Sequence, residues 1–451
     1  MLQIEVLETG ELGDRSYIAH DGTTAVVIDP QRDLDRVDAL LGGHGVAPAA
    51  VAETHIHNDY VTGGFELARQ AGADYLVAGA DAVSFARRPV GDGDELTYGS
   101  LTVRVLATPG HTHNHLAYVV SAAGDDRVGV FTGGSLLYGS VGRTDLLGSG
   151  STDALTRAQF RTAHRLAAAV PDHALLYPTH GFGSFCSSGS ATGGGIATMA
   201  QEKARNDAFT IAGEDEFVEH LLGGLTAYPA YYAHMAARNL AGPGPADLRP
   251  PERVDPAELR RRIEAGEWVV DLRHRTLFSA AHVPGTVGIE LGRQFATYLG
   301  WLVPWGAPVT LVGATESQIA DAQRQLTRIG VERPAGAAVG EIRALADGRP
   351  LGGYPRATFT DLLESPDAVV LDVRRDDERA TGHLPGSTHI PLHALLDRLD
   401  HLPDGRLWVH CASGFRASVA ASLLVRAGRE VVVVDDEVAE ASRLGMTVTA
   451  G

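Results

Sequence analysis

The chain has 451 residues, which suggests two to four domains, and its 44% hydrophobic and 21% charged content is that of a globular protein with a full core. Acidic residues outnumber basic ones by 56 to 38, which gives a formal net charge of -18. We expect no nucleic-acid partner, because the phosphates of a nucleic acid repel an acidic protein. No apolar stretch is long enough to span a bilayer and Met1–Val6 do not begin a signal peptide, so we expect a cytoplasmic protein with no membrane partner.

Residues 1 to about 180 alternate short apolar strands with helical patterns. Strands are expected at 25–29, 75–78, 101–106, 116–120 and 128–131, and residues 154–170 have helical periodicity. This pattern suits a sandwich of two sheets with helices outside. Further helices at 199–206 and 214–222 close the domain, for which we expect the bounds 1–241.

A metal-binding pattern follows a buried-strand pattern that ends at residue 52. His55 and His57 stand two residues apart on the next loop, and Asp59 follows them. Imidazole is the commonest metal-binding side chain, and one turn of an extended loop can aim both rings at one ion. Such a loop alone also fits a polar surface, but His111 and His180 each follow a later strand end. The ordered set favours a metal site.

This ordered set resembles the metallo-β-lactamase fold superfamily, and in its closest form the persulfide dioxygenase branch. The resemblance covers roughly the first half of the chain and implies an αββα sandwich with a metal site between its sheets. It implies one Fe(II) per chain, held by three histidines, which are His55, His57 and His111. Asp59 and His180 would orient these ligands.

Two positions depart from the superfamily pattern. Tyr60 replaces the last histidine of the loop, and Gly134 stands where the metal-binding aspartate belongs. The neighbouring segment 142–145, Gly-Arg-Thr-Asp, does match the dioxygenase branch. Non-haem iron commonly uses two histidines and one carboxylate, so loss of the carboxylate weakens iron binding more than zinc binding. Zinc and an empty site therefore stay open as alternatives.

A Gly/Ser-rich loop at 181–195 contains Cys186, one of only two cysteines. This composition is typical of a flexible connector, and the loop resembles the GxGSxC loop of bacterial fusions between persulfide dioxygenases and rhodanese domains. We predict that a mobile tip presents Cys186 to the metal and that this thiol relays sulfane sulfur received from Cys411 or a small thiol. An idle, exposed cysteine in a disordered loop is the alternative.

Beyond a Pro/Gly-rich linker at 242–251, the chain repeats itself. Two motifs recur 101 residues later: V-V-D-L-R at 269 as V-L-D-V-R at 370, and H-V-P-G-T at 282 as H-L-P-G-S at 383. Equal offsets predict two duplicated α/β domains, at 252–346 and 354–451. The charged strand end followed by H-x-P-G resembles the rhodanese family.

The second copy carries the strongest catalytic pattern. Cys411 comes directly after a predicted strand at 407–410 and before a helical pattern that begins at 417. Backbone N–H groups at a helix N-terminus favour a thiolate, as does Arg416, whereas an inert buried cysteine would not explain this spacing. The loop resembles that of rhodanese sulfurtransferases, and it is one residue shorter than that of related phosphatases. A persulfide on Cys411 would lie in a cradle formed by Ala412, Ser413, Gly414 and Phe415.

The first copy has Gly313 and Gln318 where the second has Cys411 and Arg416, so we expect it to be inactive. The fusion predicts a persulfide-processing enzyme of sulfur metabolism, in which iron oxidises a low-molecular-weight persulfide and Cys411 transfers sulfur to a thiol or sulfite. A homo-oligomer is expected. The alternative is a sulfurtransferase or sulfur-binding protein whose N-terminal domain is metal-poor or holds zinc. A binuclear hydrolase ranks last, because the chain lacks two of its ligands.

Overall fold

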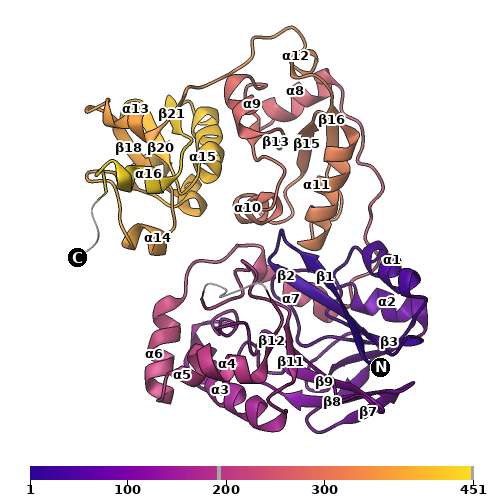
Figure 1. Cartoon of the computed structure of the whole chain (residues 1–451). Helices are drawn as coiled ribbons and strands as arrows, with labels where there is room; N and C mark the ends of the chain where they lie inside the picture. The colour runs from indigo at the N-terminus through magenta and orange to yellow at the C-terminus, as the bar shows by residue number, and fades with distance from the viewer. Residues whose placement is uncertain (190–194, 448–451) are drawn as a thin grey trace. The chain divides into compact units, whose positions relative to one another are not determined.

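The computed structural model of the chain (Figure 1) describes residues 1–189 and 195–447. The chain forms two compact units. Unit 1 consists of Met1–Asp247 with Thr327–Gly330, and unit 2 of Leu248–Leu326 with Val331–Gly451. The main boundary falls inside the predicted linker at 242–251.

Two six-stranded sheets form the centre of unit 1. The first sheet runs in chain order through β1 (Gln3–Thr9), β2 (Asp14–His20), β3 (Thr24–Ile28), β4 (Ala47–Ala52), β5 (Asp74–Ala78) and β6 (Arg88–Val90). The second runs in reverse chain order from β12 to β7, and its strands are β7 (Glu95–Tyr98), β8 (Leu101–Ala107), β9 (Leu116–Ala122), β10 (Val128–Gly133), β11 (Leu175–Pro178) and β12 (Ala197–Thr198).

Alternating side chains explain the layers of unit 1. Val26 and Ile28 belong to a core cluster shared with the second sheet, whereas Ala25 and Val27 belong to another cluster behind the first sheet. Successive residues of a strand point to opposite faces, so both faces of β3 are buried. Outside the first sheet lie α1 (Asp35–His44) and α2 (Gly64–Ala71), and outside the second lie α3 (Ser149–Ala169), α4 (Met199–Arg205), α5 (Asp207–Thr210) and α6 (Glu214–Gly224) (Figure 1). The helix α7 (Tyr232–Ala241) ends the continuous part of the unit. The result is the expected αββα sandwich.

Unit 2 contains two parallel sheets with the same strand order. The first is β14-β13-β15-β16, and the second is β19-β18-β20-β21 with the short β17 added at its edge. Their bounds are β13 (Trp268–Asp271), β14 (Val287–Gly288), β15 (Val309–Gly313), β16 (Gly336–Val339), β17 (Arg356–Ala357), β18 (Val369–Asp372), β19 (Thr388–His389), β20 (Leu407–His410) and β21 (Val431–Val434). A repeated strand order is what a duplicated domain produces, and it agrees with the repeated sequence motifs.

Helices connect the parallel strands of both copies. The first copy contains α8 (Pro256–Glu264), α9 (Arg275–Ala280), α10 (Phe295–Leu302), α11 (Glu316–Arg328) and α12 (Ile342–Leu345). The second contains α13 (Phe359–Leu363), α14 (Asp376–Ala380), α15 (Phe415–Arg426) and α16 (Val438–Arg443). Across the described residues, none of the helices has both the length and the apolar character that crossing a bilayer requires.

Candidate functional site

Five buried histidines converge on one spot of unit 1. His55 and His57 lie on the loop after β4, His111 and His115 lie between β8 and β9, and His180 follows β11. All five side chains are almost fully buried. The ring centroid of His55 lies 4.1 Å from that of His57, 4.8 Å from that of His111 and 5.3 Å from that of His180. The fold therefore brings together the four histidines that the sequence singled out.

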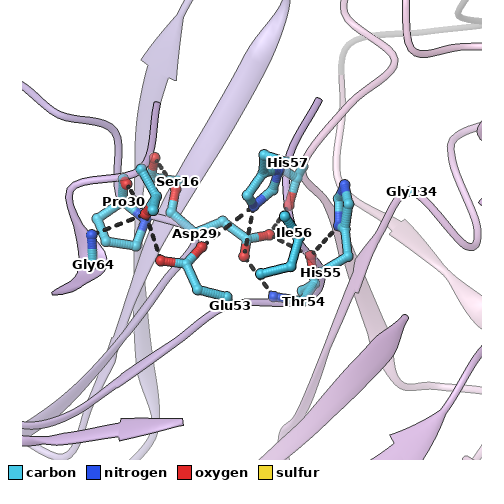
Figure 2. A network of polar contacts seen from close by, with 12 residues as sticks. Ser16, Asp29, Pro30, Glu53, Thr54, His55, Ile56, His57, Gly64 and Gly134 are labelled. Atoms are coloured by element: carbon cyan, nitrogen blue, oxygen red, sulfur yellow. Dashed lines mark hydrogen bonds and ion pairs between the residues drawn. The ribbon is translucent and has the colours of Figure 1, made fainter. Parts of the chain in front are cut away.

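Asp29 organises the loop that carries the first two histidines (Figure 2). Its carboxylate accepts hydrogen bonds from the N–H and the hydroxyl of Thr54, both at 2.7 Å, and from the hydroxyl of Thr179. Nε2 of His57 lies 3.2 Å from Asp29 and 3.4 Å from Glu53. Burial opposes a charge on His57, but these two carboxylates outweigh it and raise the pKa of His57 to about 9.

Hydrogen bonds fix which ring nitrogen is free in His55 and His111. Thr54 gives its only hydroxyl proton to Asp29, so its oxygen accepts a hydrogen bond from Nδ1–H of His55 at 2.9 Å. The carbonyl of Arg143 accepts a hydrogen bond from Nδ1–H of His111 at 2.7 Å. In both rings Nε2 therefore carries the lone pair. Nε2 of His111 is buried and has no hydrogen-bond partner among the described residues.

Two carboxylates hold His180. Its Nδ1 lies 2.9 Å from Asp14 and 3.2 Å from Asp59, the residue expected to orient a ligand. Burial lowers the pKa of His180, but Asp59 and Asp14 outweigh it and raise that pKa well above its usual value. Nε2 of His180 lies 3.4 Å from Nε2 of His55, so the two nitrogens share either a proton or a cation.

Gly134 leaves no room for the missing carboxylate. A Cβ atom at this position would lie 2.3 Å from Cδ2 of His111. The backbone N–H of Gly134 donates to Nε2 of His115 at 3.0 Å, and Nδ1–H of His115 donates to the hydroxyl of Thr108 at 2.8 Å. His115, which the sequence analysis did not single out, therefore supports the loop and offers no nitrogen to a metal. Position 134 therefore supplies no carboxylate for the common non-haem iron ligand set.

Four groups of side chains at this spot are compact enough to hold a metal ion. Two of them contain carboxylates: Asp14 and Asp59 with His180, and Asp29 and Glu53 with His57. The two groups without a carboxylate are His55, His57 and His180, and His111, His180 and Cys186. In each group one ligand atom per residue lies within 4.8 Å of the others. The predicted ligands His55, His57 and His111 are thus divided between the two groups, and His180 is common to both.

Cys186 does not lie on an exposed tip. Its side chain is fully buried, and burial raises the pKa of the thiol well above its usual value. Its carbonyl accepts a hydrogen bond from the N–H of Arg143 at 2.9 Å, and its own N–H donates to the hydroxyl of Ser184 at 3.2 Å. The prediction of a mobile loop is therefore wrong around Cys186, because small residues let the chain pack closely there. Residues 190–194 of the loop lie outside the described part of the chain.

In unit 2, Cys411 occupies the expected position between β20 and α15. Gly414 caps the helix with a φ of 88°, and a Cβ there would lie 1.9 Å from Oδ1 of Asp435, so this turn requires glycine. The first N–H groups of α15 have no partner within the helix. Of these, the N–H of Phe415 belongs to the cradle predicted from Ala412 to Phe415, and the cradle stays a prediction. Cys411 itself is only 1% exposed.

Arg416 is paired with a carboxylate that the sequence analysis missed. Both of its terminal nitrogens donate to Glu378, one of them at 2.6 Å. Burial opposes the charge of Arg416, but the bond to Glu378 outweighs it and raises the pKa of Arg416 further. Cys411 also contributes to this raised pKa of Arg416, so the charges of the two side chains interact. Glu378 offsets part of the charge of Arg416, and stabilisation of the Cys411 thiolate by Arg416 stays a prediction. Nothing in the spacing of Glu378 and Arg416, which lie on different helices, indicated this pair.

The first copy closes its own cradle. Gly313 ends β15, and the amide oxygen of Gln318 accepts a hydrogen bond from the N–H of Ala314 at 2.8 Å. This N–H belongs to the loop that would hold a persulfide in an active copy. The first copy also contributes Tyr298 of α10, whose ring centroid lies 5.5 Å from that of Phe415 in the second.

Comparisons with known proteins agree with both sites. The family model of the rhodanese-like domain matches residues 356–440. The mitochondrial persulfide dioxygenase ETHE1 of Homo sapiens is 27% identical over 216 residues, which cover 48% of this chain and 75% of that protein. The N-terminal part of the chain is therefore similar to persulfide dioxygenases, and its C-terminal part contains a rhodanese-like domain. An uncharacterized protein of Mycobacterium tuberculosis is 29% identical over 187 residues, which cover 36% of this chain and 81% of that protein.

A solved structure extends the likeness. The metallo-β-lactamase from Staphylococcus aureus has a TM-score of 0.67 and 25% identity to this chain, and the match covers 75% of this chain and 99% of that one. This share exceeds unit 1, so the likeness continues into unit 2. The fold is therefore a metallo-β-lactamase-type sandwich followed by a region with a rhodanese-like domain, and the homology supports enzymatic activity in sulfur metabolism.

Proposed function

We propose that the chain oxidises low-molecular-weight persulfides in unit 1 and transfers sulfane sulfur at Cys411 in unit 2. The observation that carries the second half is the position of Cys411 at the N-terminus of α15, within the region that the rhodanese-like model matches. Homology to persulfide dioxygenases supports the first half. With both activities in one chain, sulfur would pass from one active site to the other.

The transfer step needs no oxidant or reductant. The thiolate of Cys411 attacks the outer sulfur of a donor such as thiosulfate, the S–S bond of the donor breaks, and sulfite leaves with the bonding electrons. An acceptor thiolate then attacks the outer sulfur of the Cys411 persulfide, and Cys411 leaves as a thiolate. The N–H groups of the 412–415 cradle stabilise the negative outer sulfur. Because Cys411 is 1% exposed, small donors are favoured.

Oxidation of the persulfide requires a metal ion. The residues of unit 1 fit an ion held by histidines better than an iron held by two histidines and a carboxylate at position 134. Nε2 lone pairs of His55 and His111 are available, but Gly134 offers no oxygen ligand. A bound redox-active metal would supply the activation of dioxygen. Within the chain, Asp29 and Glu53 hold His57 (Figure 2). Asp14 and Asp59 hold His180. One Fe(II) per chain remains our prediction, with zinc as the alternative.

Two assays on the full chain test the proposal. Metal-loaded wild type should consume oxygen with a low-molecular-weight persulfide and should convert thiosulfate with an acceptor thiol. Cys411→Ser should lose thiosulfate transfer and keep oxygen uptake, whereas His111→Ala should show the reverse. Transfer without oxygen uptake in the iron-loaded wild type would favour the second candidate, a sulfurtransferase whose unit 1 is metal-poor or holds zinc. The closed space at Gly134 is the observation behind that candidate.

A further inference from the structure

We propose that Cys186 takes the place of the missing carboxylate, and that His111, His180 and Cys186 form a nitrogen–sulfur site for a borderline-soft divalent metal ion, zinc above all. The inference bears on the choice between the two candidate functions, because zinc has no redox chemistry. A zinc-bound unit 1 fits the sulfurtransferase candidate and opposes the oxidation of persulfides there. The inference itself is tested by metal binding.

The first argument is geometric. One ligand atom each from His111, His180 and Cys186 lies within 4.8 Å of the other two, and all three side chains are fully buried. Zinc binds sulfur at about 2.3 Å and nitrogen at about 2.0 Å with tetrahedral geometry, so two ligand atoms of one ion stand about 3.3–3.6 Å apart. The three atoms must therefore approach one another by at most about 1.5 Å to reach this spacing.

The second argument is an independent one, the unpartnered nitrogen of His111. Its Nδ1–H is engaged by the carbonyl of Arg143 at 2.7 Å, so the lone pair lies on Nε2. Nε2 is buried and is without a hydrogen-bond partner among the residues that the structure describes. Buried polar atoms in native proteins are nearly always satisfied, and a bound ion would satisfy this one.

The third argument is that one residue fixes two of the ligands. The backbone of Arg143 accepts a hydrogen bond from His111 and donates one to the carbonyl of Cys186 at 2.9 Å. Its guanidinium binds Asp145 at 2.7 and 2.8 Å and the carbonyl of Phe185 at 3.0 Å. The loop around Cys186 is therefore held beside His111. Such support from residues behind the ligands is typical of metal sites.

The donor set selects the class of metal. A thiolate with two imidazoles and no carboxylate suits zinc better than iron, which prefers an oxygen ligand in its common non-haem site. Gly134 cannot supply that oxygen, because a Cβ there would overlap His111. His55, whose Nε2 lies 3.4 Å from Nε2 of His180, is the candidate for the fourth position.

The test compares the two cysteines, which lie in different units. Wild type, Cys186→Ser and Cys411→Ser are stripped of metal and titrated with Zn²⁺ and Co²⁺. We expect one equivalent bound by wild type and by Cys411→Ser, with a thiolate-to-cobalt charge-transfer band in both. Cys186→Ser should lose the band and bind Zn²⁺ at least about tenfold more weakly. An unchanged band and affinity in Cys186→Ser would overturn the inference.

A second measurement uses the wild type, so it does not depend on the folding of a variant. X-ray absorption at the zinc edge of the zinc-loaded wild type should show one sulfur ligand at about 2.3 Å beside nitrogen ligands at about 2.0 Å. A zinc ion surrounded by nitrogen and oxygen ligands alone would overturn the inference. So would a sulfur adduct on Cys186 in the zinc-loaded protein after incubation with a persulfide donor, because that outcome supports the thiol relay. Oxygen uptake bears only on the proposed function, so failure of either proposal can be recognised separately.

Discussion

Replacement of Gly134 by aspartate is the obvious way to restore an iron-type ligand set, and the structure predicts that it fails. The Cβ of any residue at position 134 would lie 2.3 Å from Cδ2 and 2.6 Å from Cγ of His111. Ordinary contact begins near 3.4 Å, so the ring would have to move by about 1 Å. That movement would break its 2.7 Å hydrogen bond to the carbonyl of Arg143.

Gly134→Ala isolates this effect from that of the carboxylate. Overpacking of a well-packed site costs about 1–3 kcal/mol, and loss of a hydrogen bond adds about 0.5–1.5 kcal/mol. We therefore expect unit 1 to lose about 2–4 kcal/mol of its free energy of unfolding, which lowers its Tm by about 5–15 °C for a unit of this size. Gly150→Ala is the matched control, because nothing lies within 4 Å of a Cβ at Gly150.

Hydrogen exchange read by mass spectrometry measures the effect in unit 1. Tryptophan emission serves as an internal control for unit 2, which contains all four tryptophans: Trp268, Trp301, Trp305 and Trp408. In Gly134→Ala and Gly134→Asp, the amide hydrogens of peptides around His111 should exchange faster than in wild type. The urea concentration at the midpoint of the change in tryptophan emission, which reports on unit 2, should stay the same. Wild-type protection and wild-type zinc content in Gly134→Ala would refute the reasoning.

Three further predictions concern unit 2. Cys411→Ser should abolish thiosulfate transfer, because a serine oxygen cannot carry sulfane sulfur, and Gly313→Cys added to it should restore none; measurable transfer in either variant would contradict this. Glu378→Gln should remove the carboxylate that pairs with Arg416. Because thiosulfate is an anion, the KM for thiosulfate should then fall, and an unchanged or higher KM would contradict this. Burial raises the pKa of Asp372, but its arginine partner and His410 outweigh it and lower that pKa to about 2. Asp372 therefore contributes about 2 kcal/mol above its unfolded pKa of 3.8, and this is lost as the pH falls toward 2. The difference in urea midpoint between wild type and Asp372→Asn should shrink below pH 4, and a constant difference from pH 7 to pH 3 would count against it.

Much of the architecture followed from periodicity in the sequence. The strand expected at 25–29 is β3, and the helix expected at 154–170 is α3, which starts five residues earlier at Ser149 because its first turn carries no apolar pattern. The convergence of His55, His111 and His180 could be predicted because each follows a strand in the order that the resemblance implies. The structure shows that His55 follows a strand of the first sheet and that the other two follow strands of the second.

The environment of each cysteine could not be predicted in the same way. A run of glycine and serine is compatible with a mobile loop and with close packing, and only the contacts of Ser184 and Arg143 show that Cys186 is buried. The partner of Arg416 was equally hidden, because Glu378 comes from another helix and a long way along the chain. Burial and long-range charge pairs depend on tertiary contacts, which local patterns do not contain.

The two hydrogen bonds that Arg143 makes through its backbone have a consequence for how the metal site responds to disturbance. They join His111 and Cys186 to opposite sides of one residue, and neither depends on the identity of its side chain. A substitution at position 143 can therefore preserve both bonds, whereas a shift of the main chain there displaces a nitrogen ligand and a sulfur ligand together. The nitrogen ligand and the sulfur ligand would then be lost together, so the site would bind or release an ion as one unit.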